Sequence, residues 1–109
     1  KGSFVISYIS YEDVLRLELT SDDIGGSNIV NHILKAVVGW NVTVILIETN
    51  RGEVKCSFRT RDQVEFDVSK VALALGGGGH KAAAGATVKM PISEAVEHVE
   101  RVIREVLFG

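Results

Sequence analysis

The sequence has little of what stabilises a secreted domain or crosses a membrane. Cys56 is the single cysteine among 109 residues, so an internal disulfide is excluded and a reducing, cytoplasmic setting is expected. No apolar run approaches the ~18 residues of a membrane span, and no signal peptide is visible, so we expect no membrane partner. The net charge of −2 argues against a protein that coats long nucleic acids, because such proteins carry a basic excess.

Histidine is also scarce, and the three histidines are far apart in the sequence. They stand at positions 32, 80 and 98, and no loop combines them with the carboxylates that a hydrolytic metal centre needs. Counting residues does not exclude a Ser/His/Asp triad, but no nucleophile elbow is present. His32 and His98 lie on the polar sides of expected helices and are interpreted as surface residues. We therefore predict no catalytic residue and no metal ligand in this chain, which has the character of a binding module.

What is present is the composition of an ordinary globular domain, with 46% hydrophobic and 24% charged residues. Residues 1–109 fit one domain, and the residues before the first strand pattern are so few that we expect a fragment of a longer protein. Strand and helix patterns alternate, which predicts an α/β fold: a single layered domain with a mixed central sheet flanked by helices. The expected strands are 4–9, 42–48, 54–60 and 86–90, and the expected helices are 11–19, 28–38, 68–75 and 94–107.

Two of these strands carry further information. The residues of strand 4–9 are almost continuously apolar, which predicts a central strand that is buried on both faces. The turn residues 50–52 separate strands 42–48 and 54–60 and predict an antiparallel hairpin.

The second strand of this hairpin has two contrasting faces. Val54, Cys56 and Phe58 alternate along one face, so Cys56 is most simply a core residue and not a nucleophile. Ser57 and Arg59 project from the other face, since they are two residues apart in a strand. A hydroxyl beside a guanidinium suits a phosphate, which takes one hydrogen bond from the first and two from the second. On the alternation alone, a simple solvated face is the favoured explanation.

Four consecutive glycines, residues 76–79, are the most unusual feature of the sequence. Each one costs roughly 0.5–1 kcal/mol relative to alanine inside a regular element, but successive N–H groups of such a run can turn inward and bind an anion. A flexible linker is the alternative, although apolar flanks are unlike those of Gly/Ser linkers. Asp67 and Gly76 are expected to cap the two ends of the preceding helix. The alanines at 82–84 are compatible with a second helix, whose N-terminus would then point at the anion.

Residues 76–86 read GGGGHKAAAGA and closely resemble the GGGGH-x-x-AAGA signature of the DHHA1 domain. Residues 56–61 are similar to the strand of that family that ends in S-x-R-S, with Thr60 in place of the second serine. Residues 67–72 resemble its D-V-x-x-I-A helix, and residues 28–31 fall where its first long helix begins. The resemblance covers nearly the whole chain, and the glycine motif is its specific part.

The DHHA1 domain is the C-terminal, substrate-binding part of DHH-family phosphoesterases. The resemblance implies that the chain works with an N-terminal DHH domain of the same enzyme, which would hold two Mn²⁺ ions, so that this piece alone is an inactive hydrolase. It implies short RNA, single-stranded DNA or a small nucleotide as the ligand. The residues implied to hold the nucleotide and its phosphate are Ser57, Arg59, Gly76, Gly77, Gly78, Gly79 and His80.

Three readings of the function stay open at this point. The first is the substrate-binding domain of a nanoRNase-like enzyme that hydrolyses short oligonucleotides or 3′-phosphoadenosine 5′-phosphate (pAp), and the small, slightly acidic chain favours it. The second is a domain of a RecJ-type single-strand exonuclease or of a cyclic-dinucleotide phosphodiesterase. The third is a stand-alone nucleic-acid-binding module, distantly related to the C-terminal domain of alanyl-tRNA synthetases. A homodimer is compatible with each of them.

Overall fold

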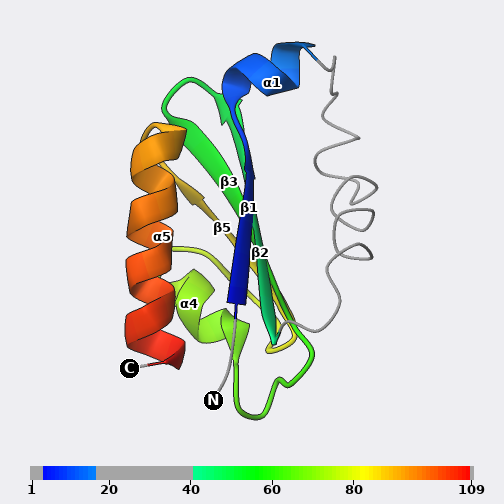
Figure 1. The fold of residues 1–109 in the computed structure, drawn as a ribbon. Coiled ribbons are helices and arrows are strands. Elements are labelled where there is room, and N and C mark those ends of the chain that lie inside the picture. Colours follow the sequence, from blue (N-terminus) through cyan, green and yellow to red (C-terminus); the bar gives the residue numbers. More distant parts are fainter. Residues whose placement is uncertain (1–3, 17–40, 109) are drawn as a thin grey trace.

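The computed structural model describes residues 4–16 and 41–108. They form a mixed α/β fold in which one five-stranded sheet, in the order β1-β2-β3-β5-β4, packs against helices α4 and α5 (Figure 1). This confirms the expected fold class. The elements in chain order are β1 (Phe4–Ile9), α1 (Tyr11–Arg16), β2 (Val42–Asn50), β3 (Glu53–Thr60), α4 (Val68–Ala74), β4 (Gly78–Gly79), β5 (Ala83–Val88) and α5 (Ile92–Leu107).

The sheet is mixed because β1 runs parallel to β2, whereas the other neighbouring strands are antiparallel. β2 and β3 form the expected hairpin, and Gly52 in its turn has the positive φ of 77° that favours glycine. β1 lies at one end of the described sheet, so the prediction of a central strand is wrong. Its apolar side chains are only partly buried, and Tyr8 is 60% exposed. The apolar run therefore predicted the strand correctly, but the side chains on both faces of this strand are only partly buried.

The core lies between the sheet and helices α4 and α5, which lie on the same side of it in Figure 1. Alternate residues of the hairpin supply the sheet side of this core, and each such buried side chain contributes roughly 1.5–3 kcal/mol of transfer free energy. α5 supplies the other side through Val99 and Ile103, which are one helical turn apart and fully buried. The sheet residues of the core are Val42, Val44, Leu46, Val54, Cys56, Phe58, Ala84, Ala86 and Val88.

The two ends of α4 follow the prediction from sequence. The Asp67 side chain accepts a hydrogen bond from the Ser69 N–H at 3.0 Å, and Gly76 follows the helix with φ of 88°. α5 departs from the prediction at its start, because Pro91 is its N-cap residue and Ser93 lies within the first turn without a capping bond. The extended backbone of Pro91 (ψ 155°) ends the preceding segment and starts the helix two residues earlier. The helix expected at 28–38, with His32, lies outside the described residues.

The alanine run after the glycines is a strand, so the prediction of a second helix at this place is wrong. Ala83 begins β5, which pairs with β3 from Arg59↔Ala83 to Val54↔Val88. The high helix propensity of alanine is overridden because the ladder and the burial of alternate side chains stabilise an extended backbone. No helix N-terminus therefore follows the glycines, and β4 and β5 form a hairpin instead.

Candidate functional site

The glycine run has two different local structures over four residues. Gly76 and Gly77 end α4: the Gly76 N–H donates to the Leu73 carbonyl at 3.0 Å and the Gly77 N–H donates to the Ala72 carbonyl at 2.7 Å. With φ of 88° at Gly76, this is a Schellman motif. Two of the N–H groups of the run are thus already used by the helix end and are not free to bind an anion.

Gly78 and Gly79 form the edge strand β4, which pairs with Gly85 and Ala84. His80 exchanges both backbone hydrogen bonds with Ala83, at 2.8 and 3.2 Å. Because bonded and non-bonded pairs alternate along an antiparallel ladder, the N–H of Gly79 points away from β5. It lies on the edge of the described sheet that pairs with no further described strand.

The hairpin turn after β4 is fixed to the rest of the fold by two backbone bonds. The Lys81 carbonyl accepts from the Val68 N–H at 3.1 Å, which ties the turn to the first residue of α4. The Ala82 carbonyl accepts from the Thr60 N–H at 3.1 Å, which ties it to the end of β3. These bonds hold the glycine segment in one position relative to β3.

The four glycines also differ in the room that a side chain would have at each position. A Cβ at Gly77 would lie 2.1 Å from the Gly85 carbonyl oxygen, and one at Gly79 would lie 2.6 Å from the Ala84 Cα. Neither position can hold a side chain without moving the backbone. A Cβ at Gly78 would meet nothing within 4 Å, and its φ is not positive. Of these four glycines, Gly78 is therefore the one whose residue type the fold does not require.

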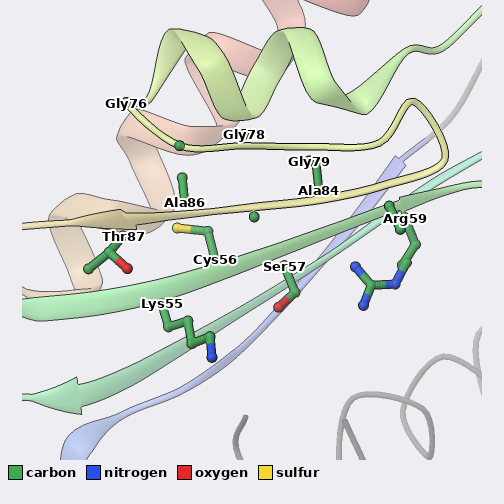
Figure 2. A pocket seen from close by; sticks show the side chains of 13 residues that line it. Lys55, Cys56, Ser57, Arg59, Gly76, Gly78, Gly79, Ala84, Ala86 and Thr87 are labelled. Carbon is green, nitrogen blue, oxygen red and sulfur yellow. The ribbon is translucent and has the colours of Figure 1, made fainter. Parts of the chain in front are cut away.

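A pocket of about 610 Å³ lies beside this segment, over the strands β3 and β5. Among the described residues, the charged side chains that line it are Lys55 and Arg59, and none of the lining residues is acidic. Figure 2 shows Lys55, Ser57 and Arg59 pointing to the same side of β3. The lining residues are Lys55, Cys56, Ser57, Arg59, Gly76, Gly77, Gly78, Gly79, Ala83, Ala84, Gly85, Ala86 and Thr87.

The register of the strands places small residues beside the two polar ones. Ser57 pairs with Gly85 and Arg59 pairs with Ala83, so that β5 leaves space next to both side chains. Ser57 and Arg59 are half-buried. Arg59 donates through Nη1 to the Phe58 carbonyl at 2.9 Å, and no carboxylate of residues 4–16 or 41–108 pairs with it. In that same part of the chain the Ser57 hydroxyl has no hydrogen-bond partner.

The structure therefore brings Ser57, Arg59 and the glycines of residues 76–79 to one pocket. His80 is not among the lining residues: it is exposed in the turn that follows Gly79. Sequence reasoning left Lys55 and Thr87 out of the site. Lys55 belongs to the same alternation as Ser57 and could have been found from it, whereas Thr87 required knowledge of the β3–β5 pairing.

Cys56 lies behind this pocket with its side chain in the core. Its side chain is fully buried, and burial raises the pKa of the thiol to about 12. A thiol with so high a pKa is not a thiolate near neutral pH and is a poor nucleophile. The prediction of a core residue is confirmed.

The described part of the chain has neither a metal-binding cluster nor a membrane-spanning helix. No group of three or more His, Cys, Asp or Glu side chains is placed to hold a metal ion there. None of the described helices is long and apolar enough to cross a bilayer.

Comparisons with known proteins show the family to which this fold belongs. A model of the DHHA1 domain family matches residues 2–107. The chain belongs to the DHHA1 domain family. The bifunctional oligoribonuclease and PAP phosphatase NrnA of Thermus thermophilus is 41% identical over 91 residues, which are 83% of this chain and 25% of that protein. The chain thus spans a quarter of the length of this DHHA1-containing relative.

Two solved structures share the fold of this DHHA1 domain. An exopolyphosphatase-related protein from Bacteroides fragilis superimposes with a TM-score of 0.76 at 21% identity, over 94% of this chain and 28% of that one. The pGpG-specific phosphodiesterase PggH from Vibrio cholerae gives a TM-score of 0.57 at 15% identity, over 96% of this chain and 33% of that one. At these identities the likeness concerns the fold.

Proposed function

We propose that this DHHA1 domain binds the substrate of a DHH-family phosphoesterase, and that its pocket holds a phosphate of a short oligonucleotide or of pAp. One observation carries the proposal. The guanidinium of Arg59 stands beside the hydroxyl of Ser57 in this pocket. Within residues 4–16 and 41–108, no carboxylate pairs with Arg59, no group bonds to the hydroxyl, and no acidic side chain lines the pocket. A half-buried cation with free donors is stabilised when an anion supplies the missing acceptors.

The donors around this point match a phosphate. Arg59 offers the planar fork that binds two oxygens of one phosphate, and Ser57 offers a single O–H. Gly79 lines the same pocket, and its backbone carries no side chain that would keep a ligand away. Gly78 presents no side chain to the space in front of it, so a nucleotide can lie directly against the backbone. We assign to His80, which is exposed directly after Gly79, a contact with the outer part of the ligand.

The size of the substrate follows from the pocket and from the charge. A volume of about 610 Å³ lies within the range of sites for small ligands, and a net charge of −2 gives no basic surface excess for a long polymer. The relative NrnA is named for oligoribonuclease and PAP phosphatase activity, which supports short RNA and pAp as the ligand class.

Hydrolysis is assigned to a DHH domain elsewhere in the enzyme. Such a domain would supply two Mn²⁺ ions to activate water, because no metal-binding cluster exists in residues 4–16 and 41–108. The residues described here bind and orient the nucleotide. We expect this chain alone to bind its ligand without cleaving it.

Substitution of the two phosphate-binding side chains tests this proposal. We expect Arg59→Ala to weaken the binding of a 5′-phosphorylated dinucleotide by about 10- to 100-fold, since a charged hydrogen bond is worth about 1.5–3 kcal/mol. We expect Ser57→Ala to weaken it by about three- to tenfold, as for a neutral hydrogen bond. The measurement is an equilibrium titration in EDTA, which prevents metal-dependent hydrolysis of the ligand.

Arg101→Ala is the matched control, because Arg101 is an exposed arginine of α5 that does not line the pocket. Its affinity is expected to equal that of the unmodified protein. Unchanged affinity in both Arg59→Ala and Ser57→Ala, with melting temperatures preserved, would show that the phosphate is not held here.

A further inference from the structure

We propose that the Lys55–Thr87 end of the pocket is a second phosphate subsite, which binds the internucleotide phosphate and thereby favours chains of two or more nucleotides over mononucleotides. This inference rests on the proposed function, in which Arg59 and Ser57 bind a first, terminal phosphate. It concerns two residues that the resemblance to the family did not single out.

The strand geometry places the two cations at opposite ends of the pocket. Lys55 and Arg59 are four residues apart on one face of β3, so their Cα atoms are separated by about 13 Å in an extended strand. Lys55 pairs directly with Thr87 on β5, which puts an ammonium and a hydroxyl side by side. Both side chains are exposed and line the pocket. This end repeats the pairing of a cation with a hydroxyl that Arg59 and Ser57 provide at the other end.

The charge of Lys55 is free to act on a ligand. Within the described residues Lys55 has no ion-pair partner, although Glu53 stands two residues away on the same face of β3. The carboxylate of Glu53 is paired with Lys89 through Nζ at 2.6 Å. Lys89 therefore offsets the charge of Glu53, and among the described residues a positive charge remains at Lys55.

The part of β5 that lies between the two ends of the pocket, which we call its floor, has only small residues and does not obstruct an extended ligand. Gly85 faces Ser57 and Ala83 faces Arg59, so the β5 side of the pocket carries no side chain larger than a methyl group until Thr87. A mononucleotide held by its phosphate at Arg59 leaves the far end empty. A dinucleotide extends along this floor, and the flexible stem of Lys55 lets its ammonium reach the next phosphate.

The test compares two dinucleotides in the intact protein, titrated in EDTA. Both carry a 5′-phosphate, and one has the natural phosphodiester whereas the other has an uncharged methylphosphonate link. We expect Lys55→Ala to weaken the phosphodiester by about fivefold, the upper range for an exposed ion pair. The methylphosphonate is expected to bind the unmodified protein about fivefold more weakly, and Lys55→Ala to weaken it no further, because the contact is already lost.

Two further readouts sharpen this test. Lys55→Ala is expected to reduce the slope of log affinity against log salt concentration by about 0.7, the value for one phosphate contact of a single strand. Thr87→Val, which keeps the side-chain shape, is expected to cost about twofold in phosphodiester affinity, the low end for one neutral hydrogen bond. Lys70→Ala serves as the control, since Lys70 is an exposed lysine of α4 outside this pocket.

The outcomes separate this inference from the function on which it rests. If Lys55→Ala weakens both dinucleotides equally, or neither, the second subsite is overturned. If Arg59→Ala fails to weaken a 5′-mononucleotide, the first subsite and the proposed function are wrong, whatever Lys55 does.

Discussion

Gly77 and Gly78 are neighbours in one run, yet the fold uses them differently. Gly77 packs so closely against β5 that its missing Cβ is required, whereas the position of Gly78 is sterically open. Gly77 is thus needed for the stability of the fold, whereas the proposed function uses Gly78 for access of the ligand. A run that looks uniform in the sequence combines a helix end, a close backbone contact and an open surface.

The pair Gly77→Ala and Gly78→Ala tests this division. We expect Gly77→Ala to lower the free energy of unfolding by about 2 kcal/mol or more, because its Cβ would overlap the Gly85 carbonyl. Gly78→Ala is expected to leave stability within about 0.5 kcal/mol and to weaken the nucleotide by about tenfold, through a methyl group in the ligand's path. Urea denaturation gives the first quantity and ligand titration the second.

Each variant is the control for the other, since both add one methyl group to the same run. Equal destabilisation by the two substitutions would contradict the packing described for Gly77. A stable Gly78→Ala protein with full ligand affinity would remove Gly78 from the binding surface.

Residue-level features with local causes could be predicted from the sequence. The Asp67 cap and the Gly76 helix end depend on residues within one turn of α4, and the alternation of Cys56 and Ser57 depends on β3 alone. The constraint on Gly77 could not be predicted, because it arises from Gly85 on another strand.

At the scale of elements, the residues of α5 that are fully buried against the core lie along one side of the helix: Ala95, Val99 and Ile103. Ile103 is fully buried against the sheet, whereas Val106, on the next turn, is 37% exposed. We expect Ile103→Ala to lower the free energy of unfolding by about 2–4 kcal/mol, since it leaves a cavity in the core. Val106→Ala is expected to change it by no more than about 0.5 kcal/mol.

Urea denaturation of both variants, with equal m-values, measures this difference. A similar loss in the two variants would mean that α5 packs on the sheet through a wider face than the structure shows.

The element that sequence reasoning placed only in part is β5, since the strand was expected at 86–90 and the alanines before it were compatible with a helix. Its alanines have high helix propensity, and the residues that stabilise the strand instead are more than twenty positions away in β3. The small side chains of Ala84 and Ala86 are what allow the glycine segment to lie close to β5. Helix propensity is a local quantity and strand pairing is not, so the tertiary contact decides the outcome.

At the scale of the whole molecule, the sheet assembles a pocket from segments that are far apart in the sequence. Residues 55–59 of β3 and the hairpin from β4 to β5 are brought together by the β3–β5 ladder, and helices α4 and α5 lie on the other side of the sheet (Figure 1). The binding residues thus stand on paired strands, which hold them at fixed spacings. Fixed spacings of this kind are what the proposed binding of a nucleotide requires.

An NMR titration of the ¹⁵N-labelled chain with a 5′-phosphorylated dinucleotide tests the central claim most directly. If the pocket binds the nucleotide, saturable amide shifts will be confined to residues 55–59, 76–79 and 83–87, with Gly79 and Arg59 among the largest. Arg59→Ala will reduce these shifts at the same ligand concentration. Absence of saturable shifts in these segments, or shifts centred on α5, would contradict the assignment of this face as the nucleotide-binding site.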